Sequence, residues 1–244
     1  MQSQYGRVKA VSLLSGGLDS STLLAYVISL GYEVVALSFD YGQRHNRELK
    51  SAEKVAAYYK VQHRIMKIDL RGIGGSALTD DISVPNLPLN EIGKDIPVTY
   101  VPARNTILLS IGLALAEVTG ASKIFIGANA LDYSGYPDCR PEYFESINRT
   151  FSIATKRTVE GESIQVEAPL LRYSKAEIVK LAVKLQVPLE LTWSCYQGGE
   201  KACGVCDSCK LRLKGFMEAG EEDPIEYENL PDFYSSYLRT RKKY

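Results

Sequence analysis

The feature that most constrains the fold is a glycine turn between an expected strand and an expected helix near the start of the chain. Residues 8–14 form a short apolar run that ends at Ser15, Gly16 and Gly17. After this turn, apolar residues recur at helical spacing until Gly31, where the helix is expected to end. A strand that passes through a glycine turn into a helix is typical of the first unit of a parallel α/β sheet.

The alternation of strands and helices continues along the chain. Further strands are expected at residues 33–39, 64–68, 123–128 and 165–168, and helices at residues 49–59, 105–119 and 144–154 and after the capping box of Ser174 and Glu177. Because strands and helices alternate from the first residues onward, we predict an α/β fold with a doubly wound, Rossmann-like parallel sheet.

Two segments depart from this pattern. Residues 70–102 are rich in glycine and proline and are too long for a plain connector, so they are expected to be a lid, a partner surface or a disordered segment. The last residues, acidic over 221–228 and basic over 239–243, are expected to form a peripheral tail. We place one domain at residues 1–190, with an insertion at 70–102, and a four-cysteine segment, helix and tail at 191–244.

Composition excludes several classes of protein. The chain has 244 residues, of which 45% are apolar and 24% charged, and its formal net charge is zero. This balance disfavours a broad electrostatic grip on nucleic acid. The longest apolar stretch, residues 107–116, falls short of the about 20 residues of a membrane span. No secretory signal is recognisable at the start, so the cytoplasm is the expected compartment.

The glycine turn predicts a phosphate site. Residues 15–22 are small or polar where a strand meets a helix, so backbone N–H groups and the helix dipole can hold an anion. The turn contains no lysine of the Walker type, which would neutralise a transferring γ-phosphoryl group. A loop that holds the β,γ-pyrophosphate as one unit favours attack at the α-phosphate, which is adenylation.

Four cysteines near the carboxyl end predict a metal site. Cys195, Cys203, Cys206 and Cys209 fall within 15 residues, a packing that suits a metal better than disulfides in a reducing cell. Zinc held by four thiolates has no open position, so its role would be structural. An iron–sulfur cluster is the alternative. The fifth cysteine, Cys139, is expected to be a small buried side chain rather than a nucleophile.

The turn resembles the PP-loop of the N-type ATP pyrophosphatases, whose signature S-G-G-x-D-S matches at Ser15, Gly16, Gly17, Asp19 and Ser20. The resemblance implies a fold like that of the adenine nucleotide alpha hydrolases and the use of ATP with Mg²⁺. It implies that Asp19 assists the magnesium ion and that Ser38 and Phe39 meet the adenine. The nucleotide-binding residues would then be Leu14, Ser15, Gly16, Gly17, Leu18, Asp19, Ser20, Ser21, Thr22, Ser38 and Phe39.

Further segments are similar to one branch of that superfamily, the 7-cyano-7-deazaguanine synthases of queuosine biosynthesis. They are residues 39–43, 101–105, 129–141 and 191–195. Ala103 stands where the family usually has glycine. The resemblance implies that ATP adenylates 7-carboxy-7-deazaguanine, that ammonia gives the amide, and that a second ATP converts the amide to the nitrile. It also implies a homodimer and a small-molecule substrate rather than a nucleic acid.

Several side chains are candidates for ligand contact on this resemblance. Lys175 and Arg104, each at the start of a helix, are candidates for phosphate contact, although solvated cations are an equal alternative. Asp132 and Arg140 could bind the amide edge and the carboxylate of the base. Tyr133, Tyr136 or Trp193 could stack on it, although aromatic residues are more often part of a core.

Two other functions stay open at this point. A PP-loop tRNA thiolase would also adenylate its substrate, but the neutral charge disfavours RNA binding and only Cys139 would remain for sulfur transfer. A non-catalytic zinc adaptor with a vestigial loop is disfavoured by the intact Asp19 and both glycines. An ATP–pyrophosphate exchange assay separates the adaptor from the enzymes.

Overall fold

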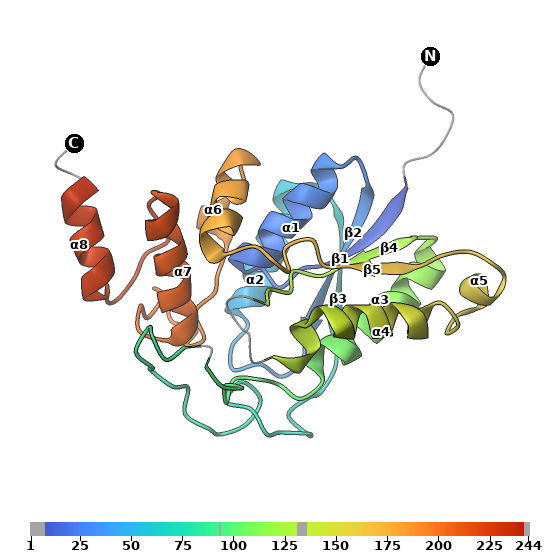
Figure 1. Ribbon diagram of the computed structural model, residues 1–244, viewed down its shortest axis with the longest axis horizontal. Helices are drawn as coiled ribbons and strands as arrows, with labels where there is room; N and C mark the ends of the chain where they lie inside the picture. Colours follow the sequence, from blue (N-terminus) through green and yellow to red (C-terminus); the bar gives the residue numbers. More distant parts are fainter. Residues whose placement is uncertain (1–7, 93, 131–135, 242–244) are drawn as a thin grey trace, which may run out of the picture.

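A parallel sheet organises the chain in the computed structural model, which describes residues 8–92, 94–130 and 136–241. Five strands lie in the order β3-β2-β1-β4-β5, and every neighbouring pair is parallel (Figure 1). The strands are β1 (Lys9–Leu13), β2 (Glu33–Asp40), β3 (Gln62–Lys67), β4 (Lys123–Phe125) and β5 (Gln165–Glu167). The predicted α/β class with a parallel sheet is therefore confirmed.

Helices cover both faces of the sheet. The α-helices are α1 (Leu18–Ser29), α2 (Arg47–Tyr58), α3 (Arg104–Thr119), α4 (Pro141–Phe151), α5 (Lys156–Val159), α6 (Lys175–Lys184), α7 (Asp207–Ala219) and α8 (Asp232–Arg241), with short 3-10 turns η1 (Pro137–Cys139) and η2 (Leu189–Leu191). One apolar cluster joins the sheet to α3 and α4, and a second joins it to α1, α2, α6 and α7. This arrangement is the predicted double winding (Figure 1).

The predicted helix ends follow from local chemistry. Ser174 and Glu177 form the expected capping box at the start of α6, where each side chain accepts from the other's backbone N–H. Gly120 ends α3 in a left-handed conformation, with φ of 74°. Strands β4 and β5 end earlier than predicted: β4 ends at Phe125 rather than at residue 128, and β5 ends at Glu167 rather than at residue 168. Residues 126–128 line a cavity instead of continuing the ladder.

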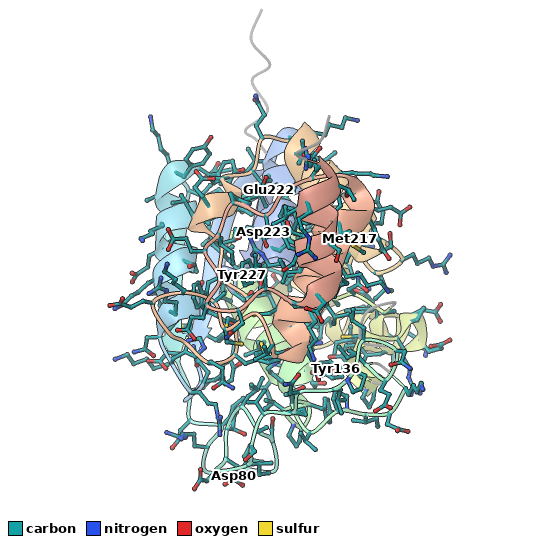
Figure 2. All side chains as sticks on the ribbon, turned by 90° about the vertical axis from the view of Figure 1, so that its left-hand side faces the viewer. Asp80, Tyr136, Met217, Glu222, Asp223 and Tyr227 are labelled. Atoms are coloured by element: carbon teal, nitrogen blue, oxygen red, sulfur yellow. The ribbon has the colours of Figure 1, made fainter. Side chains whose placement is uncertain are left out.

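The segment 70–102 is packed against the rest of the protein over the residues that the structure describes. Ala77 is fully buried and Leu78 is 7% exposed. The Leu87 N–H donates to the Asp207 carboxylate of α7 at 3.1 Å, and Lys210 donates to the Leu87 carbonyl at 2.6 Å. These contacts make the predicted disorder wrong for this part of the chain. Figure 2 shows Asp80 at the outer edge of the segment.

The carboxyl end is not the peripheral tail that the sequence predicted. Residues 232–241 form α8, whose Tyr234 is only 2% exposed and packs in the second apolar cluster. The connection from α7 to α8 carries Asp223, which is buried in an ion pair with Arg212 at 2.6 Å (Figure 2). The order of acidic and basic residues along the chain gave no sign of these contacts. The packing of α8 depends instead on its three aromatic residues, Phe233, Tyr234 and Tyr237. No helix in the described ranges has the length and apolar character needed to cross a bilayer.

Candidate active site

The turn between β1 and α1 is braced by its own side chains. The Ser15 and Ser20 hydroxyls lie 2.9 Å apart, and the Ser15 N–H donates to the Ser20 hydroxyl at 3.1 Å. The Gly17 N–H donates to the Ser15 hydroxyl at 3.3 Å. Gly17 is the N-cap residue that precedes α1, and it has no side chain to accept a hydrogen bond. The first N–H groups of the helix therefore remain available to a ligand. The turn thus has the geometry that an anion cradle requires, and residues 15–20 are called the cradle below.

Glycine is required at the apex of this cradle. Gly16 has φ of 86°, and a Cβ atom there would lie 2.3 Å from the Glu48 carbonyl oxygen and 2.5 Å from the Ala52 nitrogen. The backbone of the cradle therefore packs directly against the backbone of the first turns of α2. This contact fixes the position of the start of α2 relative to the loop.

The cradle opens into a cavity of about 270 Å³ at the carboxyl ends of β1, β2 and β4. This volume is near the lower end of the about 300–1,000 Å³ typical of small-molecule sites. A parallel sheet binds ligands at this edge because its loops diverge there. The polar side chains on the wall are Ser15, Asp19, Ser20, Tyr41, Gln43, Arg44, His45, Glu48, Arg104, Asn105, Asn129, Tyr136, Lys175, Ser194, Tyr196, Ser208 and Arg212.

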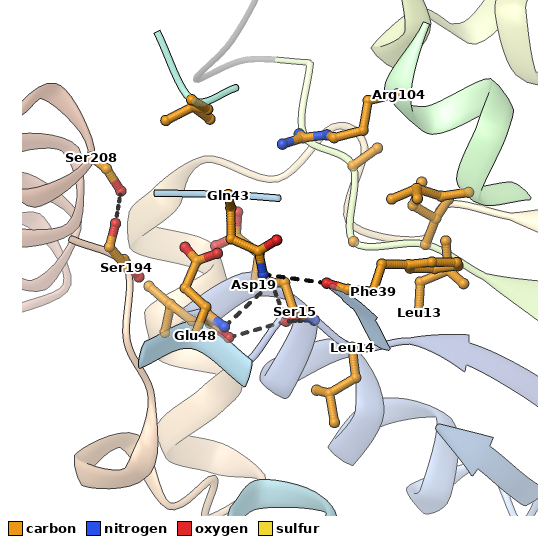
Figure 3. A pocket seen from close by; sticks show the side chains of 18 of the residues that line it. Leu13, Leu14, Ser15, Asp19, Phe39, Gln43, Glu48, Arg104, Ser194 and Ser208 are labelled. Atoms are coloured by element: carbon orange, nitrogen blue, oxygen red, sulfur yellow. Dashed lines mark hydrogen bonds between the residues drawn. The ribbon is translucent and has the colours of Figure 1, made fainter. Parts of the chain in front are cut away.

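Two cations reach the cavity from different helices. Lys175, at the start of α6, forms an ion pair with both carboxylate oxygens of Asp19, at 2.7 and 2.9 Å. Arg104, at the start of α3, points into the cavity and donates to the Tyr41 hydroxyl at 3.5 Å (Figure 3). Burial opposes the charge of Arg104, but Tyr41 and Tyr136 raise the pKa of its guanidinium, which stays cationic. Both residues, which were predicted to contact phosphate, therefore line the same cavity as the cradle.

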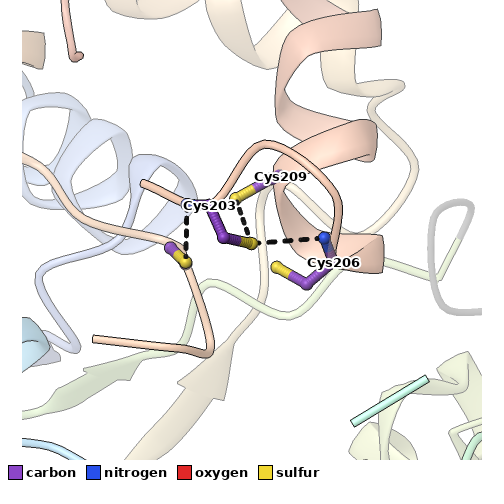
Figure 4. A group of neighbouring side chains, drawn as sticks. Cys203, Cys206 and Cys209 are labelled. Carbon is purple, nitrogen blue, oxygen red and sulfur yellow. Dashed lines mark hydrogen bonds between the residues drawn. The ribbon is translucent and has the colours of Figure 1, made fainter. Parts of the chain in front are cut away.

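The four predicted metal ligands come together. The sulfur atoms of Cys195, Cys203, Cys206 and Cys209 all lie within 4.8 Å of one another, and all four residues are buried (Figure 4). Hydrogen bonds among the four thiols lower the pKa of Cys195 and Cys203 and raise the pKa of Cys206 and Cys209, so the protons are shared unevenly within the cluster. A tetrahedral set of thiolates suits zinc and leaves no position for a reacting water. The geometry fits a structural metal.

The cysteine cluster is joined to the cradle through the backbone that precedes it. The Trp193 N–H donates to the Gly16 carbonyl at 2.9 Å, and the Trp193 indole N–H donates to the Cys195 carbonyl at 3.0 Å. Next to this point, Ser194 and Tyr196 line the cavity, and the Ser208 hydroxyl donates to the Ser194 carbonyl at 2.6 Å. The cluster therefore holds one wall of the site.

Comparison with known proteins agrees with this site. The sequence profile of the family described as "Queuosine biosynthesis protein QueC" matches residues 9–220. The chain belongs to the QueC family. It is 62% identical over 237 residues to the 7-cyano-7-deazaguanine synthase of Thermoplasma acidophilum, covering 97% of this chain and 99% of that protein.

A second relative and one solved structure extend the comparison. The 7-cyano-7-deazaguanine synthase of Picrophilus torridus is 61% identical over 233 residues, which are 96% of this chain and 97% of that protein. The structure of NMN synthetase from Francisella tularensis aligns with a TM-score of 0.47 and 14% identity, covering 97% of this chain and 84% of that one. The resemblance predicted from the sequence motifs is thus confirmed at the level of the QueC family.

Most of the predicted nucleotide-binding residues of this QueC-family chain line the cavity. Leu14, Ser15, Gly17, Leu18, Asp19, Ser20 and Phe39 line it. Gly16, Ser21 and Thr22 lie behind this surface, and the Thr22 hydroxyl donates to the Leu18 carbonyl at 2.8 Å. The Ser38 hydroxyl donates to the Leu14 carbonyl at 2.5 Å and contacts the His63 ring at 2.7 Å, so it is used inside the sheet.

The predicted substrate residues are placed less favourably. Trp193 is 5% exposed, and the Arg47 guanidinium covers its ring at 4.4 Å, so the indole stacks within the protein and not in the cavity. Arg140 is exposed and begins α4 away from the cavity wall. Tyr136 does line the cavity. Asp132 and Tyr133 lie outside the described residues.

Cys139 has the environment of a structural residue. It is 5% exposed, the Asn105 amide donates to its sulfur at 3.4 Å, and burial raises the pKa of its thiol to about 11. A protonated thiol is a poor nucleophile. The prediction that Cys139 is a small buried side chain fits this geometry.

Sequence reasoning did not single out Glu48 and Gln43, which both project into the cavity (Figure 3). A signal for Glu48 was present. It stands at helical spacing from Ala52 and Val55, on the stripe of α2 that is otherwise apolar and buried. A carboxylate on a buried stripe predicts a functional position.

Proposed function

We propose that this QueC-family chain is a 7-cyano-7-deazaguanine synthase that converts 7-carboxy-7-deazaguanine and ammonia to the nitrile, using two ATP molecules and releasing AMP and pyrophosphate. The observation that carries the proposal is the anion cradle of residues 15–20 opening into the same cavity as Arg104. No lysine stands in the cradle itself, so the loop is suited to holding a leaving pyrophosphate.

In the first step, a substrate carboxylate oxygen attacks the α-phosphorus of ATP. The bond from that phosphorus to the bridging oxygen breaks, and pyrophosphate leaves. The N–H groups at the start of α1 would hold the pyrophosphate, and Arg104 would neutralise the charge that develops opposite them. Ammonia then attacks the acyl carbon and displaces AMP, which gives the amide.

In the second step, the amide oxygen attacks the α-phosphorus of another ATP. When the nitrogen loses its two remaining protons, the C–O bond breaks, AMP departs and the C≡N bond forms. The same cradle serves both adenylations because both release pyrophosphate. The protein's contribution is to position the reactants and to offset the phosphate charge.

Two metals fit the residues present. Asp19 would hold a magnesium ion in place of its contact with Lys175, and the Lys175 ammonium would turn to a phosphate. Magnesium supplies charge neutralisation on the phosphates. Cys195, Cys203, Cys206 and Cys209 would hold zinc as a structural ion, and their role is to keep the wall of residues 193–196 in place.

The base would be held by the wall opposite the cradle. Tyr136 offers an aromatic surface to the deazaguanine, Phe39 would meet the adenine of ATP, and Asn105, Asn129 and Gln43 contribute amide groups to the wall. We keep Asp132, Tyr133 and Arg140 as candidates for the amide edge and the carboxylate. A homodimer is the expectation that accompanies family membership, and sedimentation velocity would test it.

The test is a product assay with ATP, Mg²⁺, ammonia and 7-carboxy-7-deazaguanine. We expect AMP, pyrophosphate and the nitrile, and Asp19→Ala should abolish turnover while leaving the fold intact. ADP and phosphate as the sole nucleotide products would contradict the proposal. A parallel assay with unmodified tRNA addresses the thiolase alternative, which has little support because the four clustered cysteines are engaged and Cys139 is buried.

A further inference from the structure

Nitrile formation requires a proton acceptor in addition to the groups that hold ATP and the substrate. This inference rests on the proposed function. Ammonium is the main form of ammonia in neutral water, so the nitrogen loses one proton to become a nucleophile, one on forming the amide and two on forming the nitrile. None of these protons leaves during the first adenylation, where a carboxylate oxygen is the nucleophile. A base dedicated to the nitrogen would therefore act only after that step.

Glu48 lies where such a base is needed. Its side chain rises from the first turn of α2 into the cavity, beside Ser194 and facing the space above the cradle (Figure 3). The backbone carbonyl of the same residue abuts Gly16, so the position of the carboxylate is tied to that of the cradle. Over residues 8–92, 94–130 and 136–241, no hydrogen bond or ion pair engages this carboxylate.

The other described acids and bases on the cavity wall are engaged elsewhere. Asp19 is paired with Lys175 at 2.7 Å. Both ring nitrogens of His45 are used, since Nδ1 accepts from the Arg47 N–H at 3.2 Å and Nε2 donates to the Cys195 carbonyl at 3.0 Å. The Cys139 thiol is buried and protonated. Among these groups, Glu48 is the one with a free acceptor.

The charge of the ligands also favours a nitrogen partner for Glu48. ATP and the carboxylate substrate are both anions, and a second carboxylate in their cavity repels them. An ammonium ion or a protonated amine is attracted instead, and it donates hydrogen bonds that a carboxylate accepts. The side chain therefore favours ammonium, which is the one cation among the reactants.

We propose that Glu48 is a catalytic residue that binds the nitrogen donor and accepts the protons that the nitrogen loses. One Glu48 carboxylate oxygen takes a proton from ammonium, and the freed electron pair forms the C–N bond as AMP leaves. The extra proton on the attacking nitrogen then passes to water, which gives the neutral amide. The same oxygen, after releasing its own proton to water, takes one proton from the adenylated amide as the C–O bond breaks, and the second N–H proton passes to water.

The surroundings of Glu48 suit this role. Burial raises the pKa of its carboxyl to about 7, with a smaller opposing effect of the Arg104 guanidinium and a smaller raising effect of Cys195. Tyr41 is the other titratable group that interacts with it. A base whose pKa is near the working pH both accepts and releases protons efficiently.

The experiment compares two reactions in Glu48→Gln. Carboxylate-dependent ATP–pyrophosphate exchange, measured without ammonia, reports the first adenylation. Nitrile formation with ammonium reports the nitrogen chemistry. We expect exchange at the wild-type rate and nitrile formation reduced by about 100-fold or more. Glu48→Asp should restore part of the nitrile activity. Glu53→Gln, an exposed position on the same helix, is the matched control and should behave as the wild type in both assays.

A second nucleophile sharpens the test. Hydroxylamine is already largely neutral at pH 7, so it does not require the first deprotonation. We expect Glu48→Gln to form the hydroxamate at close to the wild-type rate. Unchanged nitrile formation in Glu48→Gln would overturn the inference, and so would an equal loss of exchange, which would place Glu48 in binding ATP or the acid. Absence of carboxylate-dependent exchange in the wild type would instead overturn the proposed function, and the inference with it.

Discussion

Ala103 holds a backbone conformation that favours glycine. It has φ of 52° and ψ of 22°, and it directly precedes α3 and Arg104. An L-residue in this left-handed region is strained because its Cβ approaches the following carbonyl. This geometry explains why the family usually has glycine at the position. The sequence showed that this chain has alanine there instead, but it did not show what the difference means for the backbone. The turn is retained because α3 and Arg104 depend on it.

The strain predicts that Ala103→Gly stabilises the protein. We expect the free energy of unfolding to rise by about 1 kcal/mol, which is the relief of left-handed strain less the greater freedom of glycine in the unfolded chain. Urea unfolding followed by circular dichroism measures the change. Ala103→Val is the opposing variant and should destabilise. A loss of stability in Ala103→Gly would show that the turn is not strained.

Sequence reasoning selected residues that line the cavity where their position depends on the backbone. The cradle was predicted because small residues between a strand and a helix leave few alternative structures. It misplaced Trp193, because whether an aromatic ring faces a ligand or a neighbour depends on tertiary contacts such as the one with Arg47. It overlooked Glu48 because an amphipathic helix is recognised by its apolar residues, and a charged residue on the apolar face is then passed over.

At the scale of elements, the cysteine segment and the β1–α1 turn form one structural unit. The segment reaches the turn through the hydrogen bond from Trp193 to Gly16. It also reaches the start of α2 through His45, which donates to the Cys195 carbonyl. Gly198 lies against the same imidazole, where a Cβ atom would come within 2.3 Å of the ring. The cysteine cluster therefore supports the cradle, and a metal held by all four thiolates would leave no ligand position open to a substrate.

This coupling predicts that loss of the metal impairs adenylation. Cys206→Ser should release metal, lower the thermal midpoint and reduce ATP–pyrophosphate exchange by about 10²-fold, because the wall formed by residues 193–196 shifts relative to the cradle. Metal content, calorimetry and exchange are measured on the same preparation. Cys139→Ser, which alters the cysteine outside the cluster, should keep its metal. Full exchange activity in metal-free protein would show that the cluster and the cradle are independent.

Helix α8 is an integral element because its aromatic residues complete buried hydrogen bonds. The Asp223 N–H donates to the Tyr234 hydroxyl at 2.8 Å, and the Asp223 carboxylate in turn binds Arg212 and the Tyr227 hydroxyl. The sequence did not predict this because the last stretch has more charges than apolar residues, so helical spacing was hidden. The buried partner Asp223 lies in the connection before α8, and Arg212, which pairs with it, lies on α7, so a local pattern cannot show these contacts.

Tyr234→Phe should therefore destabilise the protein although it keeps the ring. The buried Asp223 N–H would lose its acceptor, at a cost of about 1–3 kcal/mol in the free energy of unfolding. Tyr237→Phe is the matched control: its hydroxyl donates to the Glu221 carbonyl at a partly exposed site, and the expected change is within about 0.5 kcal/mol. Equal effects of the two substitutions would contradict a special role for Tyr234.

For the whole molecule, apolar packing crosses the boundary placed at residue 190. Leu213 and Phe216 of α7 and Tyr234 of α8 belong to the same cluster as Leu23 of α1 and Ile178 of α6. The boundary itself stays a prediction. Strand–helix alternation predicted the layers correctly, but alternation says nothing about which helices share a core. That information resides in side-chain contacts between segments far apart in the sequence.

A shared core predicts that the two parts unfold together. Trp193 is the one tryptophan of the chain and lies in the cysteine segment, so its fluorescence reports on residues 191–244. Far-ultraviolet circular dichroism is dominated by the helices around the sheet. With the metal bound, urea unfolding followed by the two signals should give coincident midpoints, because loss of α7 and α8 would expose Leu23 and Ile178 to water. A fluorescence transition at distinctly lower urea would show instead that the cysteine segment and its helices form a separate unit, and that the cradle can persist without them.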